Sequence, residues 1–63
     1  MPPYYIALIH AGLGEEDEAF TYLEKAFEMR DGSLPLLKVD QRVDRLRGDP
    51  RFADLLWRVG LAA

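Results

Sequence analysis

Residues 3 to 32 read PYYIALIHAGLGEEDEAFTYLEKAFEMRDG, and this stretch decides the fold. Small and apolar residues recur in it at helical spacing, with Ala7 in the first half and Ala19, Leu23 and Ala26 in the second. Small side chains at a helix contact let the two backbones approach closely. The pattern therefore predicts two antiparallel helices packed side by side, in a protein that binds other molecules rather than one that catalyses a reaction.

Local signals set the expected bounds of these two helices. The first is expected over residues 3–13, opened by prolines and ended by Gly12 and Gly14. The second is expected over residues 15–30, because its acidic first turn complements the positive end of the helix dipole. Gly32 would supply the left-handed residue that stops it.

The segment after the second helix loses its helical rhythm. We expect an irregular, packed loop over residues 31–40, because Pro35 discourages a helix except in its first turn. A short helical turn is expected over residues 41–46, capped by the Asp40 side chain. Its apolar face would carry Val39, Val43 and Leu46.

The third helix has clear local start and stop signals. We expect it over residues 50–59, with Asp49 as its N-cap and Gly60 at its end. Arg51 and Arg58 on its flank are expected either on a solvated face or in a salt link to the acidic second helix. Its buried stripe would carry Phe52, Leu55, Leu56 and Val59. The chain is therefore predicted to be all-α: a helix hairpin followed by a loop and a short C-terminal helix.

The composition bounds what the chain can be. It has 63 residues, 11 acidic and 8 basic side chains, a net charge of -3 and no Cys. A single small domain is expected, which buries only about 60% of its unfolded surface and gains no disulfide. No stretch approaches the roughly 18 apolar residues of a membrane span. We therefore expect a soluble, cytoplasmic protein with no membrane partner.

Charge and motifs weigh against nucleic-acid binding, metal binding and catalysis. Residues 1–31 carry seven acidic and two basic side chains, a balance of -5, and the basic residues of the second half alternate with Asp. A clustered basic stripe, the footprint of nucleic-acid binding, is therefore not expected. His10 has no second His or Cys with which to share a metal. Because no phosphate-binding or nucleophile motif occurs either, we expect no cofactor, no metal and no enzyme activity.

The hairpin resembles one tetratricopeptide repeat, a helix–turn–helix unit of about 34 residues. The small and large apolar positions of such a repeat are filled here by Ala7, Gly14, Ala19, Leu23 and Ala26. His10 and Asp31 depart from the family pattern, which has Tyr and Pro there. The tail LRGDPRFADLLWRVGL is similar to the segment that commonly follows the last repeat of bacterial tetratricopeptide proteins. The resemblance implies a repeat-like hairpin with a C-terminal capping segment, which binds protein or peptide.

The first helix is apolar on every side. Eight of the ten residues from Tyr4 to Leu13 are apolar, the exceptions being His10 and Gly12. A helix that is apolar all round requires cover all round, and a single hairpin provides only part of it. We therefore expect another copy of the chain, or a preceding repeat, to cover the remainder.

Candidate interaction residues follow from this helix and from the tail. If Ala7 faces the second helix, one flank lines a groove or interface, or packs in the core. That flank is formed by Tyr4, Leu8 and Ala11. Tyr5 and Ile9 are expected in the core or against a neighbouring repeat. Trp57 is expected at the edge of the core, with an exposed binding anchor as the alternative.

Three functions from different classes remain. The leading one is a protein-interaction module, either self-associating or the C-terminal cap of a repeat scaffold. A homo-oligomer, with a dimer favoured, is expected if the chain is full length. The second is a purely structural end cap, in a protein whose activity is carried by another domain. The third, a small enzyme, is the weakest, because 63 residues leave little volume for a pocket.

Overall fold

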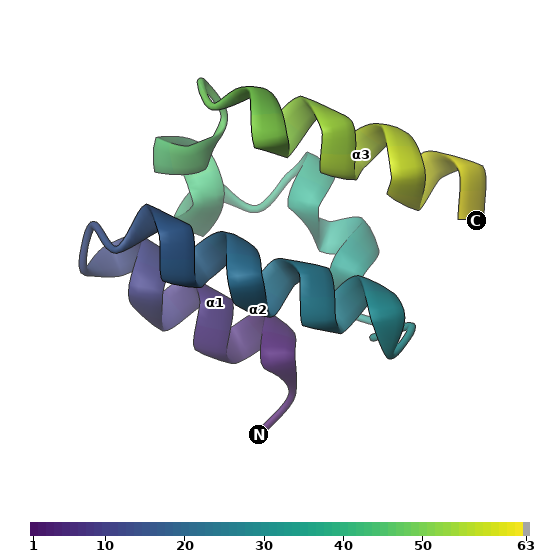
Figure 1. The fold of residues 1–63 in the computed structure, drawn as a ribbon, viewed down its shortest axis with the longest axis horizontal. Helices are drawn as coiled ribbons and strands as arrows, with labels where there is room; N and C mark the ends of the chain where they lie inside the picture. The colour runs from purple at the N-terminus through teal and green to yellow at the C-terminus, as the bar shows by residue number, and fades with distance from the viewer. Residues whose placement is uncertain (63) are drawn as a thin grey trace.

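Helices account for every regular segment of the chain (Figure 1). The computed structural model describes residues 1–62, and among these there is no strand, so the all-α prediction is confirmed. The α-helices are α1 (Pro3–Gly12), α2 (Glu16–Glu28) and α3 (Pro50–Ala62), and the 3₁₀ helices are η1 (Leu34–Lys38) and η2 (Gln41–Leu46). In the described part of the chain, no helix combines the length and the apolarity that crossing a bilayer requires.

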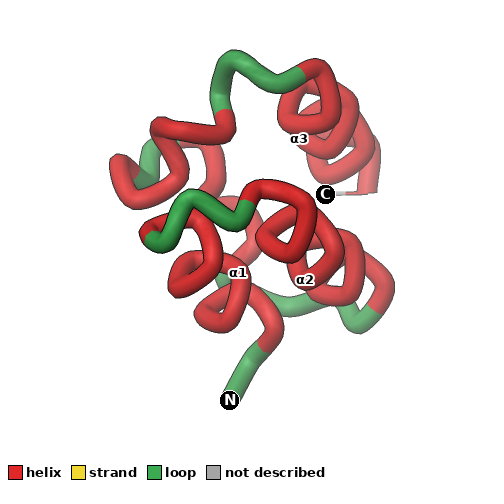
Figure 2. The backbone as a smooth tube through the Cα atoms, turned by 60° about the vertical axis from the view of Figure 1, so that its left-hand side comes forward, coloured by secondary structure: helices red, strands yellow, loops and turns green. Residues whose placement is uncertain are grey.

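The antiparallel hairpin of α1 and α2 forms as predicted (Figure 2). Its turn depends on Gly14, whose φ of 79° lies in the left-handed region that glycine adopts without steric cost. The Glu15 N–H then donates to the His10 carbonyl at 2.9 Å and closes the end of α1. Ala7 and Ala19 are both buried, as expected if α1 and α2 meet through small side chains.

The C-terminus of α2 departs from the prediction. The helix ends at Glu28, and the left-handed residue is Arg30, with φ 55°, not Gly32. The Asp31 N–H donates to the Ala26 carbonyl at 2.9 Å, which is the closing bond of a Schellman motif. Because the helix stops before residue 30, the left-handed position falls two residues ahead of the glycine.

The predicted irregular loop over residues 31–40 contains the 3₁₀ helix η1 instead. Pro35 lies in its first turn, where a missing N–H costs nothing. Leu34 and Leu37 are three residues apart, which is one 3₁₀ turn, and both are buried. The prediction was wrong because a single three-residue spacing in a segment of five residues is too short a pattern to distinguish a 3₁₀ helix from a loop.

The short helical turn over residues 41–46 is confirmed as η2, and Asp40 caps it by accepting the Arg42 N–H at 2.9 Å. Val43 and Leu46 are buried as predicted, but Val39 is exposed. Val39 precedes the cap, so the helical spacing on which its prediction rested does not apply to it.

The same start signal occurs twice, nine residues apart. Residues 40–46 read DQRVDRL and residues 49–55 read DPRFADL. Asp49 accepts the Arg51 N–H at 2.9 Å, as Asp40 does from Arg42, and in each case the Arg side chain also binds its own Asp. The predicted Asp49 cap of α3 is thereby confirmed. The predicted end at Gly60 is wrong, because the helix continues to Ala62.

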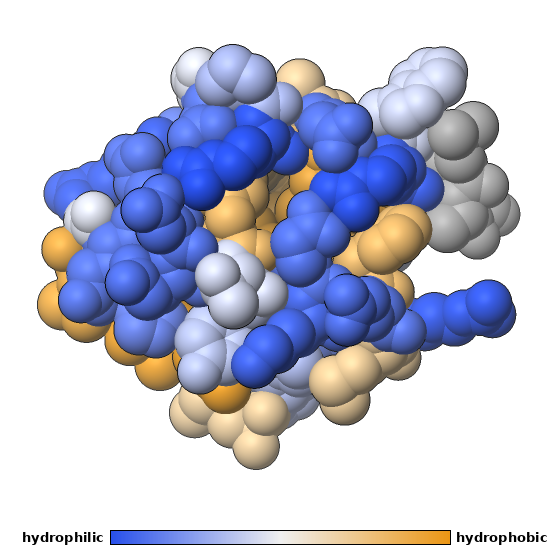
Figure 3. Space-filling model, in the orientation of Figure 1, coloured by the Kyte–Doolittle hydropathy of each residue, from blue (hydrophilic) through white to orange (hydrophobic). Residues whose placement is uncertain are grey.

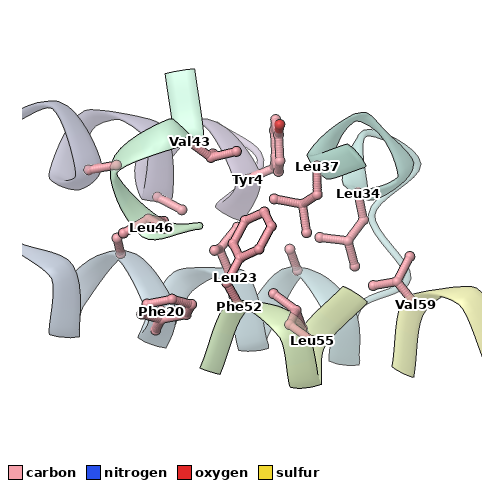
Figure 4. Close-up of a cluster of buried hydrophobic side chains, with 14 residues drawn as sticks. Tyr4, Phe20, Leu23, Leu34, Leu37, Val43, Leu46, Phe52, Leu55 and Val59 are labelled. Atoms are coloured by element: carbon pink, nitrogen blue, oxygen red, sulfur yellow. The ribbon is translucent and has the colours of Figure 1, made fainter. Parts of the chain in front are cut away.

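The core lies between the hairpin and the elements that follow it (Figure 4). Every helix contributes to it, so no element folds apart from the others. Its largest fully buried side chains are Tyr4, Leu23, Leu37, Val43, Leu46 and Leu55.

Replacing Arg30 with glycine tests the left-handed assignment. Because a non-glycine residue is strained at this φ, Arg30→Gly should raise the free energy of unfolding by about 0.5–1 kcal/mol, measured by urea denaturation. Gly32→Ala is the matched control and should change it little, because Gly32 lacks a positive φ and has open space at its Cβ position. Loss of stability in Arg30→Gly, or a large loss in Gly32→Ala, would place the left-handed residue elsewhere.

Candidate interaction surface

Tyr4 is a core residue, so of the two places expected for it, the core holds and the exposed groove is wrong. Its side chain is 0% exposed, and its hydroxyl donates to Asp40 Oδ2 at 2.7 Å. Its backbone N–H donates to Asp31 Oδ2 at 3.3 Å. One residue of α1 therefore holds both the loop after α2 and the junction between η1 and η2.

The charges around Tyr4 fix its protonation and that of Asp40. The Arg42 guanidinium, bound to Asp40 at 2.8 Å, holds the pKa of that carboxyl well below its ordinary value, and the Tyr4 hydroxyl bond acts in the same direction. Burial, together with the bond to Asp40, raises the pKa of the Tyr4 hydroxyl. Tyr4 thus stays a donor and Asp40 an acceptor at neutral pH.

The rest of the predicted flank is also closed or only half open. Ala11 is buried, which fits the core alternative and not the interface, and Leu8 is half-buried against the core. The physical reason is that η2 packs on this side of α1. The sequence pattern shows which residues share a flank but not which segment covers that flank.

The open side of α1 carries Tyr5 and Ile9, and the C-cap residue Leu13 continues their four-residue spacing. Their exposed fractions are 39%, 52% and 68%. We call these three residues the α1 outer face. Tyr5 and Ile9 were expected in the core or against another repeat, and the structure leaves them uncovered within the chain. Leu13 was missed, although its four-residue spacing from Ile9 was a usable signal.

The α1 outer face contrasts with the rest of the surface. Residues 1–14 contain no Asp, Glu, Lys or Arg. In Figure 3 the surface over α2 and α3 is mostly blue, whereas orange atoms lie at the lower left, where Figure 1 places α1. The apolar side of α1 is therefore exposed to water, and no charged residue lies beside it on the same helix.

Trp57 is exposed on α3, so its expected place at the edge of the core is wrong. Its exposed fraction is 67%. Leu55 points to the core, and Trp57 follows it by two residues, about 200° further round the helix. The alternative reading, an exposed binding anchor, fits this position.

Arg51 and Arg58 join α3 to α2, which is the salt-link reading of the two that the sequence left open. Arg51 binds Asp17 at 3.0 Å and lies over the Phe20 ring at 4.4 Å. Arg58 binds Glu24 in the same way and lies over the Phe27 ring at 5.3 Å. In both cases the Phe follows the acidic residue by three positions. The bond to Arg58 lowers the pKa of Glu24. Two of the acidic side chains of α2, Asp17 and Glu24, are therefore paired within the chain.

His10 pairs with Glu15. Its Nδ1 lies 2.8 Å from Glu15 Oε1, and its ring stacks on Tyr22 with the ring centroids 5.5 Å apart. This exposed pair lies at the α1–α2 turn.

An open hollow of about 520 Å³ lies elsewhere, and its lining comprises Phe27, Glu28, Arg30, Asp31, Gly32, Leu34, Pro35 and Val59. The His10–Glu15 pair therefore does not line this hollow. No cluster of three or more metal-ligating residues occurs among the residues that the structure describes.

Comparisons of the chain with family models, with curated proteins and with solved structures find no match. The site is therefore defined by its geometry: an uncharged, uncovered side of α1 and an exposed Trp57 on α3.

Asp40 should make stability depend on pH. Since its folded pKa is depressed, its contribution is complete above about pH 5 and is lost as the pH falls below about 4, where the unfolded carboxyl takes up a proton. At pH 7, Asp40→Asn should cost about 1–2 kcal/mol of unfolding free energy, because charge-assisted bonds to Arg42 and Tyr4 weaken. Urea denaturation at pH 7 and at pH 3 measures both. The difference between wild type and variant should shrink at pH 3, and an unchanged difference would contradict the assignment.

Proposed function

We propose that this chain is a protein-interaction module that binds another helical unit through the α1 outer face. The observation that carries the proposal is the exposed apolar side of α1, formed by Tyr5, Ile9 and Leu13 without a charged residue on the same helix. Contiguous exposed apolar patches of several hundred Å² are typical of interaction sites. Tyr5 suits such a site, because its ring adds apolar area while its hydroxyl tolerates water.

The free energy of burying apolar surface favours contact between the α1 outer face and a partner. An interface that covers about 400 Å² of apolar surface offers on the order of 10 kcal/mol before association costs. The other side of α1 is already used inside the chain, where Tyr4, Ala7 and Ala11 are buried. Binding therefore gains free energy without rearranging the core.

The occupant belongs to one of two classes under this proposal: a second copy of the chain, or a neighbouring repeat for which this chain is the terminal cap. The tetratricopeptide resemblance supports both, and so does the placement of α3, whose Arg51 and Arg58 each bind a residue of α2 that is 34 positions earlier. That displacement equals the length of one such repeat. Because the sequence lacks Cys, we propose a reducing compartment, the cytoplasm.

A purely structural end cap is the second candidate function. It is favoured by the way α3 is held on α2 through Arg51 and Arg58 while burying Phe52, Leu55 and Val59. In that case, the α1 outer face would contact only a fixed neighbour.

Self-association is measured by light scattering over a concentration series from about 10 µM to about 1 mM. The average mass should rise above the 7.2 kDa of one chain, and Ile9→Glu should hold it at that value, because a buried charge opposes contact. Met29→Glu is the matched control: Met29 is 69% exposed beyond the end of α2, and its variant should associate as wild type does. A wild-type chain that stays at the monomer mass would exclude a second copy as the occupant, and an Ile9→Glu chain that associates normally would contradict the proposal.

A further inference from the structure

α2 and α3 are equivalent elements of one pattern. Both have 13 residues, and Glu16–Glu28 is followed 34 positions later by Pro50–Ala62. The bonds from Arg51 to Asp17 and from Arg58 to Glu24 each span the same 34 positions. Figure 1 shows the two helices running in the same direction, one above the other. Positions on α3 therefore correspond to positions on α2.

On α2, a row of small, large and small residues lies in the contact with α1. This row is Ala19, Leu23 and Ala26, each 0% exposed. The corresponding positions of α3 are Ala53, Trp57 and Gly60, which repeat the order small, large, small at the same spacing. All three are exposed. We call them the α3 outer row.

The α3 outer row is exposed because α3 is turned about its own axis relative to α2. Its buried residues Phe52 and Val59 lie 33 positions after Ala19 and Ala26, not 34. A shift of one position is a rotation of about 100°. The side of the helix that receives α1 on α2 therefore faces solvent on α3.

Charges near the α3 outer row are already paired within the chain. Arg51 and Arg58 bind acids of α2, and Asp54 binds Arg58 at 3.0 Å. The row itself carries no charge, so an uncharged helix complements it best. Of the helices in the described chain, α1 alone contains no Asp, Glu, Lys or Arg.

We propose that the α3 outer row receives the α1 outer face of a second copy of this chain. This inference rests on the proposed function and names its partner. Figure 2 shows α1 beside α2 and α3 above α2, so the two surfaces lie on different helices of one copy. The contact joins unlike surfaces of two copies, and a contact of this kind repeats head to tail instead of closing into a two-fold dimer.

The size of the two surfaces sets the strength of the contact. An aromatic side chain such as Trp57 brings about 150–250 Å², and each surface consists of only three residues. Stable interfaces begin near about 1,200 Å², so this contact belongs to the transient class.

Trp57 is the single tryptophan of the chain and reports the contact directly. As the protein concentration rises from about 10 µM to about 1 mM, its emission maximum should move to shorter wavelength because the ring leaves water. Ile9→Glu should abolish this shift, and Met29→Glu should retain it. An emission maximum that is independent of concentration in the wild type would overturn the inference.

Mixing two variants tests the head-to-tail geometry. Ile9→Glu removes the α1 outer face and Trp57→Glu removes the α3 outer row, so each alone should remain at the monomer mass. Their mixture should form pairs of twice 7.2 kDa and go no further, because each pair has one intact contact and two blocked ends. Both substituted side chains are exposed, and circular dichroism checks that the helices persist. Ala53→Glu provides a second block of the row.

The outcomes separate this inference from the function on which it rests. If Trp57→Glu and Ala53→Glu associate as wild type does while Ile9→Glu does not, the partner surface lies elsewhere and only the head-to-tail inference fails. If Ile9→Glu also associates as wild type does, the proposed function fails as well. A mixture that stays at the monomer mass overturns the inference.

Discussion

The hydrogen bond from the buried Tyr4 hydroxyl to Asp40 is the contact on which the rest of the chain depends. It joins residues 36 positions apart and brings η2 against α1. The Arg42 side chain and the first turn of η2 are organised around the same carboxylate. Because this contact closes one flank of an all-apolar helix, the opposite flank is the one that remains for a partner.

Local rules predicted much of the fold from the sequence. The hairpin, the Gly14 turn and the caps Asp40 and Asp49 depend on residues that are close together in the chain, so their signals can be read directly. Each of these features follows from helix geometry or charge alone. The ion pairs of Arg51 and Arg58 with α2 were one of two readings of the charge pattern, and the packing of α3 on α2 decides between them.

The candidate surface was harder to predict, because it depends on contacts between distant segments. Tyr4 and Tyr5 are neighbours with the same side chain, yet one is buried and the other is 39% exposed. A difference of about 100° round the helix decides this, and only the position of η2 shows which side is covered. Trp57 was misplaced for a similar reason, because the rotation of α3 on α2 is set by core packing and not by a local signal.

The chain thus presents two uncharged surfaces, the α1 outer face and the α3 outer row, on a small helical core. The most direct test of this account is an NMR dilution series that follows every side-chain and amide signal from about 1 mM to about 10 µM. The account predicts that signals of Tyr5, Ile9, Leu13 and Trp57 shift with concentration, whereas those of Tyr4 and Ala11 stay constant. Signals that are constant throughout, or shifts centred on Tyr4 and Ala11, would contradict it.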